Sequence, residues 1–428
     1  MSRGAVLLVA LAITLAAAPA ASAGGSGLRL VNTERVNDRL LELTLRSDVL
    51  LAPTNARVLL PRGYRRSKRR YPVLYLLHGG VDDYLSWTTK GDAEALTAGY
   101  PLIVVMPDTG PGGGYVDWWN FGLPANRWET YHLTQLVPFV DRTFRTVARR
   151  GGRAVAGLSM GGFGTMSYAA RRPDTFAAAA SFSGAVDSVH PAIRAVTPPA
   201  TYGPWETQEI RWRGKNPVDL ASNLRGLRLV LRTGNGRDGG PFGGAGDGIE
   251  YVVHQASTTL HKRLRRLRIQ HLWDDYGPGN HTWPYWTRAL RQTLPILMRT
   301  FAHPRRPPSP FSHLTIEPRY EVYGWRVRIR RPAIEFSELR RADRHGFTLV
   351  GSGRARVITP PLYTPGARLR AIVRSSRWGV VRGGVTVGRT GRLGFELPLG
   401  PGNRAQQYTP GAHTVRHTTR VLLRPAGP

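Results

Sequence analysis

The sequence predicts an α/β domain, in which helices cover both faces of a mostly parallel sheet, followed by a small all-β domain. Nearly continuous apolar runs alternate with helical patterns over residues 28–303, which is typical of strands buried on both faces. A proline-rich segment, residues 304–310, then reads as a linker. Beyond it, short strands and turns predict a basic β-sandwich-like domain over residues 311–428.

The elements of the first domain follow from their apolar patterns. The expected strands are residues 39–50, 55–61, 71–80, 100–108, 153–159, 227–236 and 268–277. Helices are expected between them. They are residues 129–146, where apolar residues recur at spacings of three and four, the segment that follows Ser159 and ends at Pro173, and residues 251–267. In the second domain, residues 323–331 alternate apolar residues with arginines, and residues 384–399 predict a hairpin.

Composition excludes several classes of protein. The 428 residues are 41% hydrophobic, which is enough for a large core and too much for a disordered chain. The chain has no cysteine, so disulfides, thiolate metal sites and a cysteine nucleophile are excluded. Separately, we expect neither a metal nor a cofactor. Its net charge of +32 is spread along the chain without a nucleic-acid-binding signature. We therefore expect no specific nucleic-acid partner.

The basic charge suggests a different polyanion. Residues 305–428 carry 23 Arg against 6 acidic residues, so an anionic cell-wall polymer is the partner that we expect for the second domain. The alternative is a solvated surface with a bias towards arginine.

Residues 1–23 predict a signal peptide. Arg3 supplies a positive charge, residues 5–18 form an apolar stretch, and residues 21–23 read Ala-Ser-Ala, a small-residue cleavage site. The stretch is short for a membrane anchor, which is the alternative. We expect a secreted protein, extracellular or associated with the cell wall, with no transmembrane span after removal of the signal.

The stretch VAGLSMGGFG, residues 155–164, places Ser159 between an expected strand and an expected helix. Glycines before and after the serine are what a strained nucleophile elbow requires, although a glycine-rich chain can also produce this pattern by chance. In such an elbow the backbone N–H of Met160 would be one oxyanion donor. The loop His78-Gly79-Gly80, at the end of a buried strand, would supply the second donor from Gly80, with Val81 as its neighbour.

A nucleophilic serine needs a base and an orienting acid. His281 lies in a Gly/Pro/Asn loop after the strand 268–277 and is the expected base. The acid should follow the strand 227–236. By position alone, three residues qualify: Asp238, Asp247 and Glu250.

The motifs LHGG, GLSMGGFG, GNG and GNHTWPYW together resemble the esterase D and antigen-85-type branch of the α/β-hydrolases, over about residues 28–303. The resemblance implies an α/β-hydrolase fold and a secreted bacterial enzyme. In the mycolyltransferases of this branch, a catalytic Glu lies in the first helical turn after a Gly-Asn-Gly segment. Carried over, this marks Glu250 as the acid, with Asp238 as the alternative acid. The first loop departs from that group, because it reads His-Gly-Gly-Val rather than Asp-Gly-Leu-Arg.

These residues predict a secreted serine esterase that uses Ser159, His281 and Glu250 and forms an acyl-enzyme. The expected substrate is a carboxylic ester, with a lipid or an acyl-sugar as candidates. Three tryptophans are expected to line the substrate pocket: Trp283, Trp118 and Trp119. One alternative is an acyltransferase that moves the acyl chain to a sugar or glycerol hydroxyl. Another, of a different class, is a non-catalytic cell-wall-binding protein.

Overall fold

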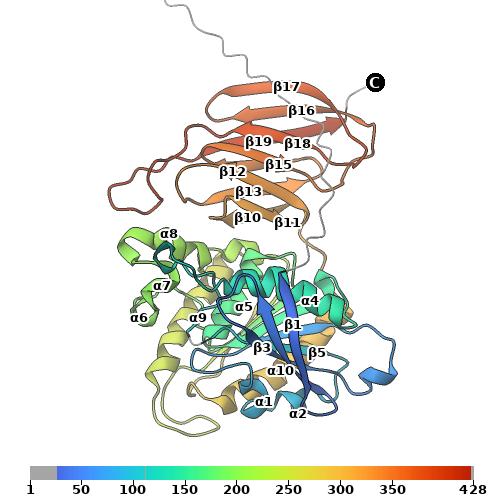
Figure 1. Cartoon of the computed structure of the whole chain (residues 1–428). Coiled ribbons are helices and arrows are strands. Elements are labelled where there is room, and N and C mark those ends of the chain that lie inside the picture. The colour runs from blue at the N-terminus through green and yellow to red at the C-terminus, as the bar shows by residue number, and fades with distance from the viewer. Residues whose placement is uncertain (1–26, 111, 426–428) are drawn as a thin grey trace, which may run out of the picture. The chain divides into compact units, whose positions relative to one another are not determined.

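The computed structural model describes residues 27–110 and 112–425, which form two compact units divided after Pro308 (Figure 1). The expected signal peptide, residues 1–23, lies outside the described residues. Within the part of the chain that the structure describes, no helix combines the length and the apolarity needed to cross a membrane.

The first unit is built on a nine-stranded mixed sheet. Along the sheet, β1, β2, β3 and β5 pair antiparallel in that order. From β5 onward, β4, β6, β7, β8 and β9 follow in that order and pair parallel. Sequence patterns did not predict β1, whose residues are mostly exposed, or β7, which is rich in alanine. In spatial order the strands are β1 (Leu28–Arg35), β2 (Leu40–Ser47), β3 (Thr54–Leu59), β5 (Ile103–Pro107), β4 (Val73–Leu77), β6 (Arg153–Leu158), β7 (Ala178–Phe182), β8 (Arg228–Thr233) and β9 (Leu272–Asp275).

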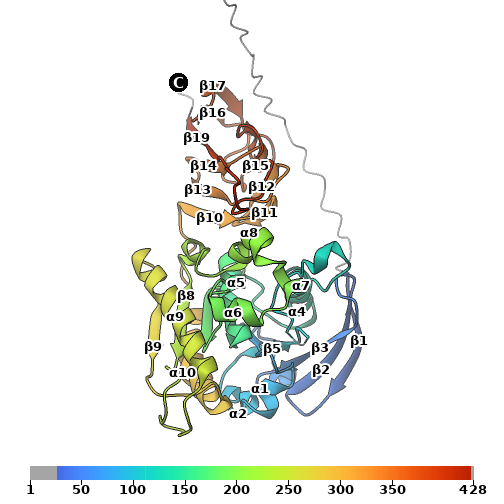
Figure 2. The ribbon, with the colours of Figure 1, turned by 90° about the vertical axis from the view of Figure 1, so that its left-hand side faces the viewer.

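Helices cover both faces of this sheet (Figures 1 and 2). Strand β4 shows why, because its alternate residues enter different cores. Leu74 and Leu76 pack with α10 (Trp283–Ala302) and with α1 (Ser86–Thr89) and α2 (Ala93–Thr97). Tyr75 and Leu77 lie with the helical segment 128–143 and with α5 (Met160–Arg171) on the other face. The remaining helices are η1 (Tyr64–Arg66), η2 (Asn120–Gly122), η4 (Arg150–Gly152), α6 (Pro191–Val196), α7 (Pro199–Tyr202), α8 (Trp205–Lys215), η5 (Ala221–Leu224) and α9 (Gly248–Arg266).

The helix expected at residues 129–146 is irregular. It begins as α3 (Trp128–Thr130), widens into a π-helical segment, η3 (Tyr131–Leu136), and continues as α4 (Val137–Thr143). Pro138 is the second residue of α4, just after the wide turn, and a proline has no N–H to donate to the preceding turn. The predicted apolar stripe is nevertheless buried along its length.

The second unit consists of two antiparallel sheets packed around one apolar core. Strand β12 alternates as predicted, with Trp325, Val327 and Ile329 buried and the intervening arginines exposed. The six-stranded sheet runs β10 (Phe311–Thr315), β13 (Ser337–Asp343), β14 (Gly346–Gly351), β19 (His417–Pro425), β16 (Arg368–Ser375) and β17 (Gly379–Thr386). The four-stranded sheet runs β11 (Arg319–Val322), β12 (Trp325–Arg330), β15 (Arg354–Ile358) and β18 (Gly394–Pro398).

The hairpin predicted at residues 384–399 is wrong. β17 pairs with β16 in the six-stranded sheet, whereas β18 pairs with β15 in the other sheet. The connection between them crosses the core, where Val387 and Leu393 are buried. Val385 of β17, Val387 after it, and Phe395 and Leu397 of β18 all enter the same core, so alternation could not show that the two strands belong to different sheets.

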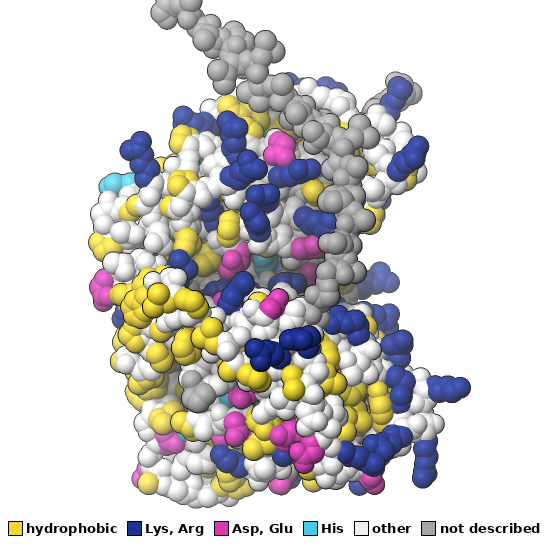
Figure 3. Space-filling model, viewed as in Figure 1, with side chains coloured by type: hydrophobic (Ala, Val, Ile, Leu, Met, Phe, Trp, Pro, Cys, Tyr) yellow, Lys and Arg dark blue, Asp and Glu magenta, His cyan; other side chains and the backbone are white. Residues whose placement is uncertain are grey.

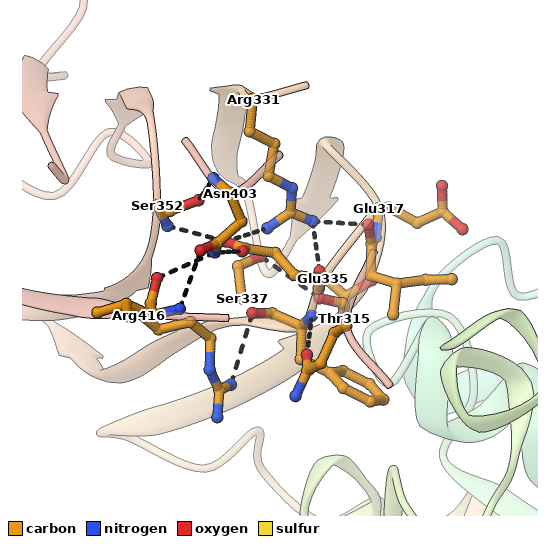
Figure 4. A network of polar contacts seen from close by, with 12 residues as sticks. Thr315, Glu317, Arg331, Glu335, Ser337, Ser352, Asn403 and Arg416 are labelled. Carbon is orange, nitrogen blue, oxygen red and sulfur yellow. Dashed lines mark hydrogen bonds and ion pairs between the residues drawn. The ribbon is translucent and has the colours of Figure 1, made fainter. Parts of the chain in front are cut away.

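A buried ion pair joins several segments of the second unit (Figure 4). Glu335 is fully buried, and its carboxylate accepts hydrogen bonds from the guanidinium of Arg331 at 3.3 Å and from the Ser352 N–H at 2.9 Å. The side-chain amide of Asn403 also donates to this carboxylate. Arg331 donates further bonds to the carbonyls of Ile316 and Glu335. Each buried charge therefore has several partners, as burial requires.

Glu335→Ala should destabilise the second unit by about 3–5 kcal/mol, because it leaves the Arg331 guanidinium buried without its counter-charge. Glu338→Ala is the matched control. Its ion pair with Arg340 is partly exposed and should contribute at most about 1 kcal/mol. Urea unfolding followed by tryptophan fluorescence measures both variants, and equal losses would contradict the prediction.

Candidate active site

Ser159 lies between the end of β6 and the first residue of α5, on a sharply turned backbone. Its φ of 52° and ψ of −119° fall in a region that residues with a side chain rarely adopt. Backbone hydrogen bonds hold this conformation. The Ser159 N–H donates to the Phe182 carbonyl at 3.0 Å, and the Ser159 carbonyl accepts from Phe163 and Ala185, both at 3.1 Å. The serine is thus fixed at the carboxyl edge of the parallel strands.

Two glycines allow this turn to pass close to β4. A Cβ atom on Gly161 would stand 2.5 Å from the His78 carbonyl oxygen and 2.6 Å from that of Leu77. A Cβ atom on Gly157 would stand 2.5 Å from the Gly161 carbonyl oxygen. These distances are too short for any side chain, so the glycine pattern around Ser159 has a steric cause.

His281 joins Ser159 to Glu250. Its Nε2 lies 2.8 Å from Ser159 Oγ, and its Nδ1 lies 2.8 Å from Glu250 Oε2. A carboxylate oxygen can only accept, so Nδ1–H donates to Glu250 and Nε2 is left to accept the hydroxyl proton of Ser159. This is the arrangement in which an imidazole can act as a base towards the serine.

The Glu250 carboxylate is completely buried and held on its second oxygen as well. Oε1 accepts the Gly234 N–H at 2.7 Å, the Ser183 hydroxyl at 2.9 Å and the Thr233 hydroxyl at 3.1 Å. These donors come from the ends of β7 and β8. They suit an ionised carboxylate, which is an acceptor at every lone pair.

Asp247 links the histidine loop to the helix that carries Glu250. Its Oδ1 caps α9 by accepting the N–H groups of Ile249 at 2.8 Å and Glu250 at 3.1 Å. Its Oδ2 accepts the His281 N–H at 2.7 Å. Burial acts to raise the pKa of Asp247, but these three N–H groups outweigh it and lower that pKa below its ordinary value. Asp238 lies exposed, and within the described residues no hydrogen bond joins it to His281.

The loop after β4 runs beside the serine. A Cβ atom on Gly79 would lie 3.7 Å from Ser159 Cβ, and one on Gly80 would lie 3.8 Å from Met160 Sδ. His78 is buried beneath the loop, and its Nδ1 donates to the Gly79 carbonyl at 2.8 Å, because a carbonyl can only accept. In a trans peptide the next N–H points the opposite way, so this bond also orients the Gly80 N–H.

Sequence reasoning missed this role of His78. A polar network lies behind it, in which its Nε2 is 3.3 Å from Asp108 Oδ1 and its carbonyl accepts the Tyr115 hydroxyl at 3.0 Å. His132 closes the network by donating from Nε2 to the Asp108 carbonyl at 2.9 Å, and it also bonds the Tyr168 hydroxyl at 2.8 Å. Burial lowers the pKa of His132 to about 4, so this imidazole is neutral at pH 7.

The three tryptophans expected at the substrate occupy different surroundings. Trp283 packs edge-on against Trp87 and Trp286, with ring centroids 5.1 and 5.3 Å apart. Trp118 donates its Nε1–H to the Gly113 carbonyl at 2.8 Å and packs near Phe163 of α5.

Trp119 instead packs against Phe121, with ring centroids 4.9 Å apart. In the described chain, none of the three expected tryptophans makes a ring contact or hydrogen bond with His281 or Ser159. The ring that does contact His281 is that of Trp286, edge-on at 4.9 Å, and the sequence had not indicated it.

This constellation suits acyl transfer through a covalent serine intermediate. A hydroxyl bonded to a neutral imidazole, which is held by a buried carboxylate, is what nucleophilic attack on a carbonyl needs. Among the described residues, no group of three or more His, Cys, Asp or Glu side chains could hold a metal ion.

Comparisons with known proteins show which family the chain resembles. A family model named Esterase, described as "Putative esterase", matches residues 47–297. An esterase of Mycobacterium tuberculosis is 34% identical over 271 residues, which cover 60% of this chain and 59% of that protein. The chain thus spans about three fifths of the length of this relative.

Two further proteins are similar over the same part of the chain. Diacylglycerol acyltransferase/mycolyltransferase Ag85B of Mycobacterium avium is 29% identical over 54% of this chain and 75% of its own length. A solved structure of an S-formylglutathione hydrolase from Agrobacterium tumefaciens matches with a TM-score of 0.53 and 17% identity, covering 63% of this chain and 99% of that one. The structural match shows a shared fold.

Acid should weaken the first unit through His132. Its folded pKa of about 4 lies below the ordinary 6.5, so below pH 6.5 the unfolded chain binds a proton that the folded chain does not. Stability should fall by about 3 kcal/mol between pH 6.5 and pH 4 from this group alone. His132→Gln should show a shallower loss over this range in urea unfolding, although it is less stable at pH 7.5. An unchanged slope would contradict the assignment.

Proposed function

The chain belongs to the esterase family, and on this premise we propose that it is a serine carboxylic-ester hydrolase that works through an acyl-enzyme. The observation that carries the proposal is the unbroken hydrogen-bonded series from Ser159 through His281 to the buried Glu250. The relatives named above are an esterase and an acyltransferase, which supports this reaction class.

In the proposed reaction, Ser159 Oγ attacks the ester carbonyl while His281 Nε2 takes its proton. Glu250 keeps the imidazole in the required tautomer and stabilises the imidazolium that forms. The backbone N–H groups of Met160 and Gly80 stabilise the oxyanion, each by about 3–4 kcal/mol. His281 then returns its proton to the leaving alcohol, and a water activated by the same imidazole hydrolyses the acyl-enzyme.

We favour an ester with an apolar acyl group, because exposed apolar side chains occur next to the site residues in the sequence. Val81, next to Gly80, is almost fully exposed, and Ile249 and Tyr251 on either side of Glu250 are more than half exposed. Phe242, in the loop before Asp247, is half exposed. Exposed apolar side chains at these positions suit an apolar ligand.

Acyl transfer is the second candidate, favoured by the similarity to acyltransferases. The same base that activates water can activate an alcohol, so the two activities differ only in which hydroxyl reaches the acyl-enzyme. We also propose export from the cell, on the strength of the signal-like sequence at residues 1–23.

The first test uses p-nitrophenyl esters of increasing chain length, with glycerol and trehalose as competing acceptors. Ser159→Ala should abolish turnover and labelling by a fluorophosphonate while the fold is retained. An acyl-glycerol or acyl-trehalose product would identify a transferase, and release of free acid alone would identify a hydrolase. Absence of both turnover and Ser159 labelling in the natural chain would refute the proposal.

The acid is tested by two matched amide variants. Glu250→Gln should lower kcat by about 10³–10⁴-fold, because its amide favours the wrong imidazole tautomer. Asp238→Asn, in an exposed loop, should keep kcat within about twofold of the natural chain. The reverse result would make Asp238 the acid.

Asp247 should position the base, and the pH profile can show it. Asp247→Asn keeps a helix-capping oxygen but removes a negative charge beside His281. The imidazolium then loses stabilisation, so the rise of kcat/KM should move to lower pH, with a loss of roughly tenfold at its plateau. A purely structural defect would lower kcat/KM without moving the pH at which it rises.

A further inference from the structure

Strands β16, β17 and β19 lie side by side in the six-stranded sheet (Figure 1). Their register places arginines of all three strands on one side of it. We call this surface the arginine face. It consists of six exposed residues: Arg368, Arg370, Arg374, Arg382, Arg420 and Arg424. Figure 3 shows Lys and Arg side chains in excess of acidic ones on the side of the second unit that it presents.

Strand register places like charges directly opposite one another on the arginine face. Arg370 pairs with Arg424, and Arg374 pairs with Arg420. Opposed like charges destabilise an antiparallel sheet. No Asp or Glu occurs in β14, β16, β17 or β19, and in the described part of the chain none of the six arginines forms an ion pair. The fold therefore keeps a concentration of charge that opposes its own stability.

A general bias towards arginine does not account for this surface. The outer side of the four-stranded sheet is equally rich in arginine, but there acids lie among the bases. Arg326 pairs with Glu321 at 3.1 Å, and Arg356 lies 3.5 Å from Glu396. A surface that only needs solvation can take this mixed form. The arginine face lacks it, which points to a partner that supplies the negative charge.

We propose that the arginine face docks a linear polymer that carries phosphate groups along its length. On a strand, alternate residues stand about 7 Å apart, and facing residues on neighbouring strands stand about 5 Å apart. Two such rows of guanidinium groups can bind successive phosphates, because the guanidinium fork matches phosphate oxygens. The proposal does not depend on the catalytic assignment.

The same strands disfavour two other polyanionic partners. β16, β17 and β19 contain no Phe, Tyr or Trp, so they offer no ring on which nucleic-acid bases could stack. Among their described side chains, Val380 is the one large apolar group with high exposure, whereas a membrane-binding surface needs several apolar anchors. A phosphate polymer without bases or acyl chains fits these features.

The experiment measures binding of the full chain to labelled inorganic polyphosphate by fluorescence anisotropy at several NaCl concentrations. Arg370→Gln/Arg424→Gln and Arg374→Gln/Arg420→Gln should each bind about tenfold more weakly or worse. The slope of log affinity against log salt should become shallower by about 1.4, at about 0.7 for each phosphate that an arginine no longer neutralises. Arg389→Gln/Arg404→Gln removes the same charge from exposed loop residues of this unit and should bind within twofold of the natural chain.

Stability and activity separate loss of binding from loss of folding. Both arginine-face variants should unfold at the same temperature as the natural chain or higher, because charge repulsion is relieved. Their turnover of p-nitrophenyl esters should be unchanged. Equal weakening in the control would reduce the effect to net charge and overturn the proposal. So would absence of polyphosphate binding, or tighter binding to single-stranded DNA or phosphatidylglycerol vesicles at equal phosphate concentration.

Discussion

The contact between Gly161 and the carbonyl oxygens of Leu77 and His78 is the constraint on which the site depends. It lets the turn at Ser159 cross the end of β4 without any intervening side chain. The same approach brings Gly79 beside the serine, so one packing contact places both Ser159 and the loop expected to hold the oxyanion. His78 then orients that loop from below through the Gly79 carbonyl.

The other half of the site is assembled around two carboxylates with different tasks. Glu250 has one oxygen on His281 and the other on donors from β7 and β8, so its position is tied to the sheet. Asp247 ties the backbone of His281 to the start of α9. Because both carboxylates lie within one helical turn, movement of the α9 N-terminus would displace Glu250 and the loop that carries His281 together.

Sequence patterns predicted the strands whose apolar runs are continuous, and the motif around Ser159 indicated the turn that the structure has. They missed β7, whose alanines carry little hydrophobic signal, and they paired β17 with β18 because alternation does not reveal which sheet a strand joins. The acid could not be chosen by position, because Asp238, Asp247 and Glu250 all follow β8. Only their contacts distinguish them. The roles of His78 and Trp286 were missed as well, because the sequence does not show which groups their side chains contact.

Ser159 and His281 are 122 residues apart in sequence yet share a hydrogen bond. Between them lie β7, β8, α9 and β9. The three strands must pair and the helix must pack before the imidazole reaches the hydroxyl. Contacts of such long range form late in folding, because loop closure must come first. During refolding, helical content should therefore return before reactivity towards a fluorophosphonate. The rate at which labelling returns would therefore report the rate at which the sheet is completed.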